Sequence, residues 1–341
     1  MTPAAPLAVT LGDPAGVGPE IIVKAWRALN AEAPFLVIGD AACLRSAPGA
    51  RDVPVQAIGA PDEAARVFPN SIPVLNQPLA APVVAGQPSA DHAKTIIGWI
   101  ETAVGLTLTG AVSGVVTAPI AKAPLYAAGF GFPGHTEFLA ELTAAENQPG
   151  ARGPVMMLAA PETKDGGLRV ALATIHTPLA QVSASLTVEG LVNAGLVTAQ
   201  ALRRDFGIAA PRLAVAGLNP HAGEGGGIGR EEIDTIAPAV RALRDLGVDA
   251  RGPTSADTLF HPEARAAYDA VLCMYHDQGL IPLKMLDFWG GVNVTLGLPI
   301  VRTSPDHGTG FDIAGRGLAR PDSLINAVRL ARDIAARRVA A

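Results

Sequence analysis

The feature that most constrains the fold is a series of short, continuously apolar runs separated by longer stretches with helical spacing. Seven runs read as strands: "LAVTLG" (7–12), "FLVIGD" (35–40), "AVSGVVTAP" (111–119), "RVALATIH" (169–176), "RLAVAGLNP" (212–220), "DAVLCMYH" (269–276) and "GVNVTLGLP" (291–299). Their apolar residues do not alternate, as expected when both faces of a sheet are covered. Between them, stretches such as 89–106 and 231–247 have apolar residues near helical spacing. This alternation predicts an α/β fold with a mostly parallel sheet.

Composition limits the class of protein. A chain of 341 residues has room for two domains at roughly 150 residues each, and 49% hydrophobic residues supply a large core. The net charge of −5 lacks the basic footprint of a nucleic-acid binder. The first residues lack a signal peptide's positive region, and no stretch reaches the roughly 20 apolar residues of a membrane span. We therefore expect a cytoplasmic enzyme with neither nucleic acid nor membrane as partner.

The two cysteines, Cys43 and Cys273, are too few for a disulfide framework or a cysteine-based metal cluster. Cys273 lies inside the apolar run "AVLCMY". Buried cysteine behaves as a small hydrophobic residue, so we expect Cys273 to pack in the core.

Three of the seven histidines come after strand candidates. His176, His221 and His276 follow the runs that begin at residues 169, 212 and 269. In open α/β sheets, ligands bind beyond the carboxyl ends of the strands. Neutral imidazoles suit zinc and other borderline divalent metals, and three of them leave coordination positions open for substrate. The residues alone leave two interpretations open: a divalent metal site, or three unrelated loop histidines.

The remaining histidines differ in their surroundings. His135, in "GHTEFLAEL", precedes a helix whose free N–H groups favour anions, with Thr136 as N-cap and ligand hydroxyl. We expect His92 on a surface helix and His261 at a helix start, neither with a ligand role.

Glycine-rich stretches raise the question of a nucleotide loop. In "LNPHAGEGGGIGR" (218–230), Gly223 and Gly225 fit the Rossmann pattern G-x-G-x-x-G, but Ile228 occupies its last position. The earlier "GDPAGVGPE" (12–20) lacks both the Walker lysine and the Rossmann spacing. The later stretch therefore predicts a loop that brings His221 close to a bound metal.

Taken together, these motifs resemble those of a known enzyme family. They are "TLGDPAGVGPE", "GHTEFLAEL", "LNPHAGEGG", "ADTLF", "MYHDQGL", "GVNVTLGLPIVRTSPDHGTG" and "AGRG", spread from about residue 7 to residue 330. Their order and spacing resemble the 4-hydroxythreonine-4-phosphate dehydrogenase family of vitamin B6 biosynthesis. The resemblance implies a two-domain α/β/α fold of the isocitrate/isopropylmalate dehydrogenase type, which binds NAD(P) without a Rossmann domain. It also implies an active site in the interdomain cleft, shared between the subunits of a homodimer.

The resemblance assigns roles to individual residues. It implies a metal site formed by His176, His221 and His276, and a substrate site formed by His135, Thr136, Lys284, Asn293 and Arg302. Lys284 and Arg302 suit the anionic ends of a substrate. The segment 304–315 resembles the one that meets the adenine side of NAD in the wider superfamily, which implies nucleotide contacts by His307, Gly308 and Thr309. We assign no residue as the catalytic base.

The implied reaction is the oxidation of 4-(phosphooxy)-L-threonine by NAD or NADP with a divalent metal, either zinc, magnesium or cobalt. Its product, 2-amino-3-oxo-4-(phosphooxy)butanoate, is a β-keto acid that loses CO₂ to give 3-amino-2-oxopropyl phosphate on the route to pyridoxal 5'-phosphate. One alternative is a dehydrogenase of the same family that acts on a phosphorylated threonate or erythronate, or on an aromatic cis-dihydrodiol. A more remote alternative is a phosphoacyl transferase.

The resemblance also implies how the chain divides into domains. Residues 1–130 plus 303–341 would form a terminal α/β domain on the nucleotide side. Residues 131–302 would form a middle α/β domain that carries the metal histidines and the dimer interface.

Overall fold

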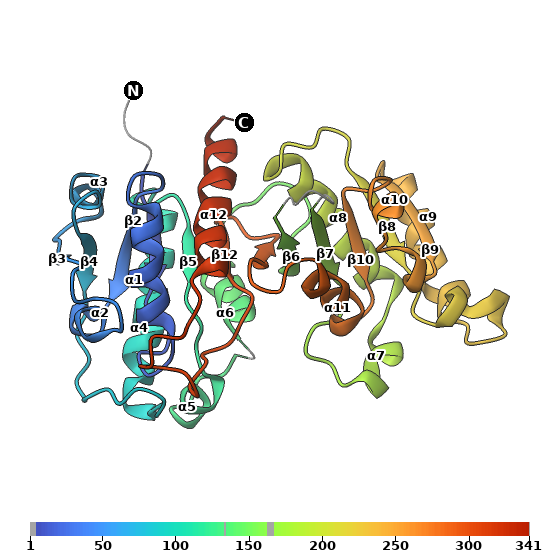
Figure 1. Ribbon diagram of the computed structural model, residues 1–341. Helices are drawn as coiled ribbons and strands as arrows, with labels where there is room; N and C mark the ends of the chain where they lie inside the picture. The colour runs from blue at the N-terminus through green and yellow to red at the C-terminus, as the bar shows by residue number, and fades with distance from the viewer. Residues whose placement is uncertain (1–4, 133, 162–166, 341) are drawn as a thin grey trace. The chain divides into compact units, whose positions relative to one another are not determined.

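The computed structural model describes residues 5–132, 134–161 and 167–340 (Figure 1). The chain forms two compact units, Met1–Glu146 with Pro299–Val339 and Asn147–Leu298 with Ala340–Ala341. Both units are α/β, and most strand pairs in each are parallel, which confirms the predicted fold class. The domain boundaries expected from the sequence, after residue 130 and before residue 303, remain a prediction.

The described residues of the first unit form six parallel strands. Their order is β3 (Val55–Ala57), β4 (Ile72–Asn76), β2 (Phe35–Gly39), β1 (Leu7–Thr10), β5 (Val115–Thr117) and β12 (Arg302–Pro305). Every residue of β1, β2, β5 and β12 is buried. Burial on both faces explains why the first three of these strands have continuously apolar sequences.

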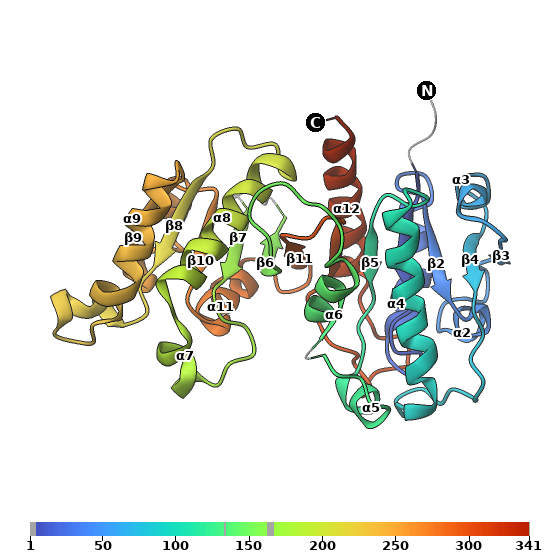
Figure 2. The same cartoon turned by 180° about the vertical axis from the view of Figure 1, so that it is seen from behind.

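Helices cover both faces of these strands. The helices α1 (Gly18–Leu29) and α12 (Asp322–Ala340) lie on one face, and α4 (Ala93–Leu108) lies on the other (Figures 1 and 2). Shorter helices complete the unit: α2 (Ala41–Ser46), α3 (Ala64–Val67), α5 (Lys122–Ala127), α6 (His135–Leu142), and the 3₁₀ turns η1 (Pro61–Glu63) and η2 (Ala90–His92). The helix predicted over 89–106 is confirmed as η2 followed by α4.

In the second unit, the described part of the chain also forms six strands. Their order is β11 (Val292–Leu296), β6 (Val155–Ala160), β7 (Leu168–Leu172), β10 (Ala270–Cys273), β8 (Arg212–Ala216) and β9 (Asp249–Thr254). β6 runs antiparallel to both of its neighbours, whereas β7, β10, β8 and β9 pair in parallel. All seven strands predicted from apolar runs are present across the two units.

In the second unit, α11 (His276–Leu286) packs on β6 and β7, and α8 (Val188–Arg204) packs on the opposite face beside α9 (Ala237–Asp245) (Figures 1 and 2). The remaining elements are α7 (Leu179–Ser185), α10 (Pro262–Arg265), the 3₁₀ turns η3 (Pro220–Gly226) and η5 (Ala256–Thr258), and the π turn η4 (Glu232–Ile236). Cys273 is fully buried in the core between β10 and α11, as expected.

Among the described residues, no single helix is both long and apolar enough to cross a membrane. The pair α7 and α8, bent by 93° at their junction, meets the length and composition test when the two are counted together.

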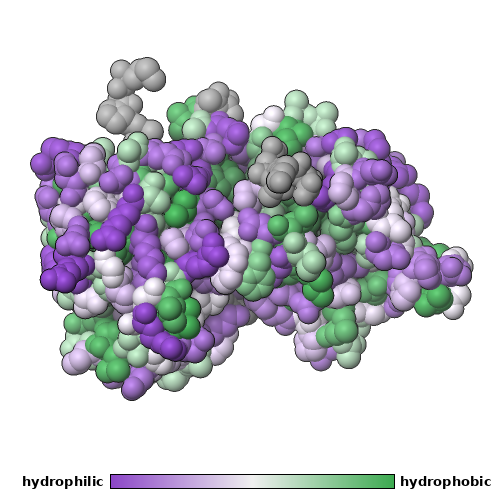
Figure 3. Space-filling view, in the orientation of Figure 1, coloured by the Kyte–Doolittle hydropathy of each residue, from purple (hydrophilic) through white to green (hydrophobic). Residues whose placement is uncertain are grey.

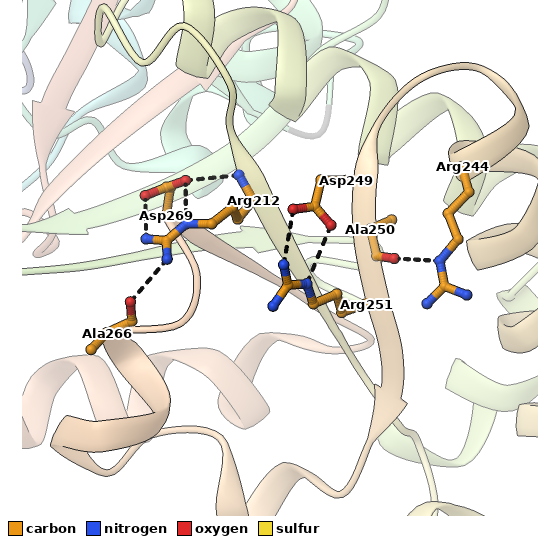
Figure 4. A network of polar contacts seen from close by, with 7 residues as sticks. All are labelled: Arg212, Arg244, Asp249, Ala250, Arg251, Ala266 and Asp269. Carbon is orange, nitrogen blue, oxygen red and sulfur yellow. Dashed lines mark hydrogen bonds and ion pairs between the residues drawn. The ribbon is translucent and has the colours of Figure 1, made fainter.

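An ion pair fixes where two strands of the second unit begin. Figure 4 shows Arg212, the first residue of β8, against Asp269, which directly precedes β10. The Asp269 carboxylate accepts hydrogen bonds from the Arg212 backbone N–H at 2.7 Å and from its guanidinium at 2.9 and 3.2 Å. Burial raises the pKa of Asp269, but the hydrogen bonds and charge of Arg212 outweigh it and leave that pKa below its ordinary value.

We predict that Asp269→Asn lowers the free energy of unfolding by about 1 to 2 kcal/mol at neutral pH, because a charged, partly buried acceptor is lost. The matched control is Asp249→Asn. The pair of Asp249 with Arg251 in Figure 4 is 48% and 59% exposed, so its loss should cost less than about 0.5 kcal/mol. Urea unfolding of both variants measures the difference.

The pH dependence of this stabilisation follows from the lowered pKa. Because the pKa of Asp269 is depressed in the folded state, its contribution is complete above the unfolded value of 3.8 and is lost as the pH falls through the folded value. The gap between wild type and Asp269→Asn should therefore begin to narrow below about pH 4 and close once the pH is below the folded pKa. Equal stability of wild type and Asp269→Asn at neutral pH would show that the Arg212–Asp269 pair does not stabilise the unit.

Candidate active site

Three of the predicted histidines lie beyond the carboxyl ends of three adjacent parallel strands. His176 follows β7, His276 follows β10, and His221 follows β8. β10 lies between β7 and β8 and pairs with both in parallel, with Cys273 opposite Leu172 on one side. All three chain segments therefore leave the sheet at the same edge, where ligands bind in open α/β sheets.

Two of these imidazoles lie side by side. The ring centroids of His176 and His276 are 6.1 Å apart. Two imidazoles that bind one tetrahedral zinc ion through nitrogens about 2.1 Å from the metal have centroids about 5 Å apart, so the observed pair is near the spacing of shared ligands but somewhat wider. The His276 Nδ1 donates to the Asp277 carboxylate at 2.7 Å, which leaves Nε2 as the ligand atom.

His221 stands apart from this pair. It lies in η3, where His221, Ala222 and Glu224 all have φ near +50°. Residues other than glycine rarely adopt this left-handed backbone conformation. Those that do cluster at functional sites. Within the described ranges, no three His, Cys, Asp or Glu side chains are grouped closely enough to hold a metal ion.

The segment that carries His221 projects from the second unit. In both Figure 1 and Figure 2, the chain between β8 and α9 extends sideways from the strands as an arm, here defined as residues 218–236. Ile228 and Ile233 on the arm are 44% and 41% exposed.

A buried glutamate fixes the base of the arm. Glu232 is 3% exposed, and its Oε1 accepts hydrogen bonds from the backbone N–H groups of Leu218 and Asn219, both at 2.7 Å. Its Oε2 accepts from the Asn219 side chain at 2.9 Å. The sequence analysis missed Glu232, because its position in a helical stretch gives no sign of burial or of backbone contacts fourteen residues away.

Two further predicted substrate residues belong to the second unit. Lys284 lies on α11, with its Nζ 5.3 Å from the centre of the Phe288 ring. Asn293 lies on β11, and its Oδ1 is buried and without a hydrogen-bond partner among the described residues. A buried polar atom that lacks a partner costs stability, and a bound ligand can satisfy it.

Exposed apolar side chains surround Lys284. On α11 and the turn after it, Ile281 is 64%, Met285 82%, Phe288 60% and Trp289 50% exposed. Hydrophobic surface is visible over this helix in the space-filling view (Figure 3). We call this group the α11 patch.

The first unit carries a buried cation. Arg302 begins β12, is 3% exposed, and donates through Nη2 to the Thr117 hydroxyl at 2.7 Å. Burial lowers the pKa of its guanidinium to about 10, and the charge of Glu137 opposes that shift. Arg302 is thus charged at neutral pH, and a buried charge is costly unless an anion pairs with it.

His135 and Thr136 lie beside this cation, at the start of α6. His135 is the first helical residue and Gly134 is the N-cap, so the expectation that Thr136 caps the helix is wrong. Thr136 is 8% exposed. His135 is partly exposed overall, but its Nε2 is buried and has no hydrogen-bond partner among the described residues. Burial, and then the charges of Arg302 and Lys122, hold the pKa of His135 well below its ordinary value.

Segment 304–315, which is predicted to meet the nucleotide, lies against the glycine-rich stretch 12–20. The carbonyl of Thr309 accepts a hydrogen bond from the Val17 N–H at 2.8 Å. A Cβ on Gly16 would lie 2.7 Å from the same carbonyl, so glycine is required for this approach. His307 is exposed, and the place of a Cβ on Gly308 has no atom within 4 Å. The turn before α1 is therefore a neighbour that the sequence analysis did not connect with this segment.

Two histidines were expected to have no ligand role. His261 is the N-cap of α10, as predicted. His92 is not on a helix surface: it is 2% exposed, at the end of η2. The polar flanks of His92 suggested a solvent-facing position, but packing at the start of α4 buries it.

The fold and these groups define a class of protein. It is an α/β enzyme with three histidines beyond the carboxyl edge of parallel strands in one unit and a buried guanidinium in the other. The chain belongs to the family of the pyridoxal phosphate biosynthetic protein PdxA, whose model matches residues 31–331. This membership confirms the resemblance carried by the motifs.

Named relatives support the same family. A 4-hydroxythreonine-4-phosphate dehydrogenase from Caulobacter vibrioides is 72% identical over 334 residues, which cover 98% of each chain. The crystal structure of a 4-hydroxythreonine-4-phosphate dehydrogenase from Klebsiella pneumoniae is 41% identical with a TM-score of 0.84, and 98% of each chain is covered. A terephthalate 1,2-cis-dihydrodiol dehydrogenase from Burkholderia xenovorans is 32% identical with a TM-score of 0.63, covering 96% of this chain and 98% of that one.

We predict that Glu232→Ala weakens zinc binding by about 10- to 100-fold, because the base of the His221 arm loses its acceptor for two backbone N–H groups. Isothermal titration with zinc measures the affinity. The control variant, Glu189→Ala, removes an exposed glutamate from α8 in the same unit. It should leave the zinc affinity unchanged. Wild-type affinity in Glu232→Ala would mean that the arm's base does not position a ligand.

Proposed function

We propose that the chain is a 4-hydroxythreonine-4-phosphate dehydrogenase, which oxidises 4-(phosphooxy)-L-threonine with NAD or NADP and a divalent metal. The observation that carries the proposal is the 72% identity, over nearly the whole chain, to a protein of that name. The product is a β-keto acid, which loses CO₂ readily because its carbonyl accepts the electrons of the breaking bond. The resulting 3-amino-2-oxopropyl phosphate would serve the pyridoxal phosphate pathway named for the family.

In this proposal, His176, His221 and His276 hold the metal. The neutral imidazole donors and the spacing of the His176–His276 pair fit zinc, and the hydrogen bond from His276 to Asp277 supports the ligand tautomer. Magnesium and cobalt are the alternatives. A bound divalent ion supplies Lewis-acid stabilisation of negative charge that develops in the reaction.

The remaining site residues bind and orient the substrate. Arg302 and Lys284 pair with its anionic ends, and Thr136 and Asn293 supply uncharged hydrogen bonds. His135, neutral because its pKa is lowered, offers a buried Nε2 to the substrate without repelling a neighbouring cation. A bound nicotinamide cofactor would supply the hydride acceptor. We assign its adenosine side to His307, Gly308 and Thr309, where the open backbone at Gly308 leaves room for a ligand.

We further propose that a homodimer completes the site. The His176–His276 pair lacks a third ligand from its own chain among the described residues, and His221 lies on a projecting arm. The exposed isoleucines of the arm and the α11 patch supply apolar surface for a second copy. In this arrangement, the arm of one subunit carries His221 to the histidine pair of its partner.

The reaction itself can be tested by following NADH or NADPH formation from 4-(phosphooxy)-L-threonine before and after treatment with a chelator. We expect turnover that chelation abolishes and that zinc, magnesium or cobalt restores, because the metal stabilises developing charge. Full activity after complete metal removal would contradict the metal's role. Faster turnover of 4-phospho-D-erythronate, or of a terephthalate cis-dihydrodiol, would favour the alternative substrates.

Subunit mixing tests the shared site. His176→Ala and His221→Ala should each be inactive alone. If His221 acts in the partner's site, half of the exchanged dimers contain one intact site of two, so an equal mixture should regain up to about a quarter of wild-type activity. No recovery, with exchange verified by mass spectrometry of differently tagged subunits, would place all three ligands in one chain.

A further inference from the structure

Lys122 is a charged residue to which no role has been assigned above. It begins α5 and lies beside the start of α6: the place of a Cβ on Gly134 is 3.5 Å from its Cε and 3.7 Å from its Nζ. Lys122 is exposed and forms neither a hydrogen bond nor an ion pair within the described residues. Its ammonium group is therefore available to a ligand at this position.

Lys122 and Arg302 act on the same residue. The charges of both cations lower the pKa of His135, after the larger effect of burial. Of the two, Lys122 lies within 4 Å of the Cβ position of Gly134, the residue before His135. Two cations therefore act on the first residue of α6.

The nearby carboxylate does not cancel this charge. Glu137 lies next to the same position, with its Oε2 3.5 Å from the place of a Cβ on Gly134. Its charge acts on Arg302, where it opposes the lowering of the guanidinium's pKa by burial. One carboxylate against two cations leaves a net positive charge, and Lys122 is the cation that supplies this excess.

Uncharged groups at the same place also lack partners. The N-cap Gly134 has no side chain to satisfy the first N–H groups of α6, and these groups favour an anion. Independently, the His135 Nε2 is buried with no hydrogen-bond partner in the described part of the chain. A buried polar atom without a partner indicates that a ligand completes the site.

We propose that Lys122 is a further substrate-binding residue, which pairs with the phosphate of the substrate and determines the preference for a phosphorylated one. The inference deepens the proposed function and rests on it. A phosphate monoester carries a charge of about −1.5 to −2 near pH 7. Arg302 alone is balanced by Glu137, whereas the addition of Lys122 offsets the charge of the phosphate. An unphosphorylated substrate gains nothing from this lysine.

The test compares Lys122→Gln, Lys122→Arg and the control Arg27→Gln. Arg27 is an exposed cation in the last turn of α1, at the end of that helix remote from the carboxyl edge of the strands. We expect Lys122→Gln to raise the KM for 4-(phosphooxy)-L-threonine by about 10- to 100-fold, with kcat changed by less than about threefold. Lys122→Arg should restore most of the affinity, and Arg27→Gln should behave as wild type.

Inhibition constants isolate the phosphate contact. Lys122→Gln should raise the Ki of inorganic phosphate in parallel with the KM, and it should leave the Ki of unphosphorylated 4-hydroxy-L-threonine unchanged. An unchanged KM overturns the proposal. An equal rise of both inhibition constants also overturns it, because the lysine would then shape the site without recognising phosphate.

A separate binding assay distinguishes this proposal from the proposed function. Inorganic phosphate should raise the thermal unfolding temperature of wild type and of Arg27→Gln, but not that of Lys122→Gln. If wild type does not turn over the substrate, the proposed reaction fails, yet this difference would still support a phosphate contact by Lys122. Equal protection of all three proteins by phosphate overturns the role of Lys122 whatever the substrate is.

Discussion

The parallel pairing of β10 with β7 on one side and β8 on the other is the constraint on which the metal-site proposal depends. Because these three strands run the same way, the chain segments that follow them leave the sheet at one edge. Packing then refines their positions. A Cβ on Gly279 of α11 would lie 2.1 Å from Val170 of β7, so the helix that begins with His276 packs against the strand that leads to His176.

The two units contribute different chemistry to the proposed reaction. The second unit presents imidazole nitrogens and the buried Asn293 amide oxygen. The first unit presents charge, with Arg302 buried at the start of β12 and Lys122 exposed at the start of α5. Burial keeps His135 neutral between these cations, so it can bind substrate without adding to their repulsion. Imidazole donors suit a borderline metal, and cations suit a phosphate.

The parts of the fold that could be predicted from sequence are those whose cause is local. Strands buried on both faces have continuously apolar sequences, and all seven predicted strands are present. β12 was missed because it is buried yet polar: the Thr303 hydroxyl donates to the carbonyl of Ala327 on α12, a contact that local composition cannot reveal. The burial of His92 and the backbone contacts of Glu232 depend likewise on segments distant in sequence. The histidines after strands could be found, but the projection of His221 on an arm could not.

The central claim is that one metal ion is held by imidazoles delivered from three adjacent parallel strands, with His221 from the other subunit. Anomalous diffraction at the zinc edge, from crystals of the zinc-loaded protein, tests this claim most directly. The account predicts one peak per subunit about 2.1 Å from nitrogens of His176 and His276 and of the partner's His221. A single fully occupied zinc peak elsewhere, or one held by all three histidines of the same chain, would contradict it.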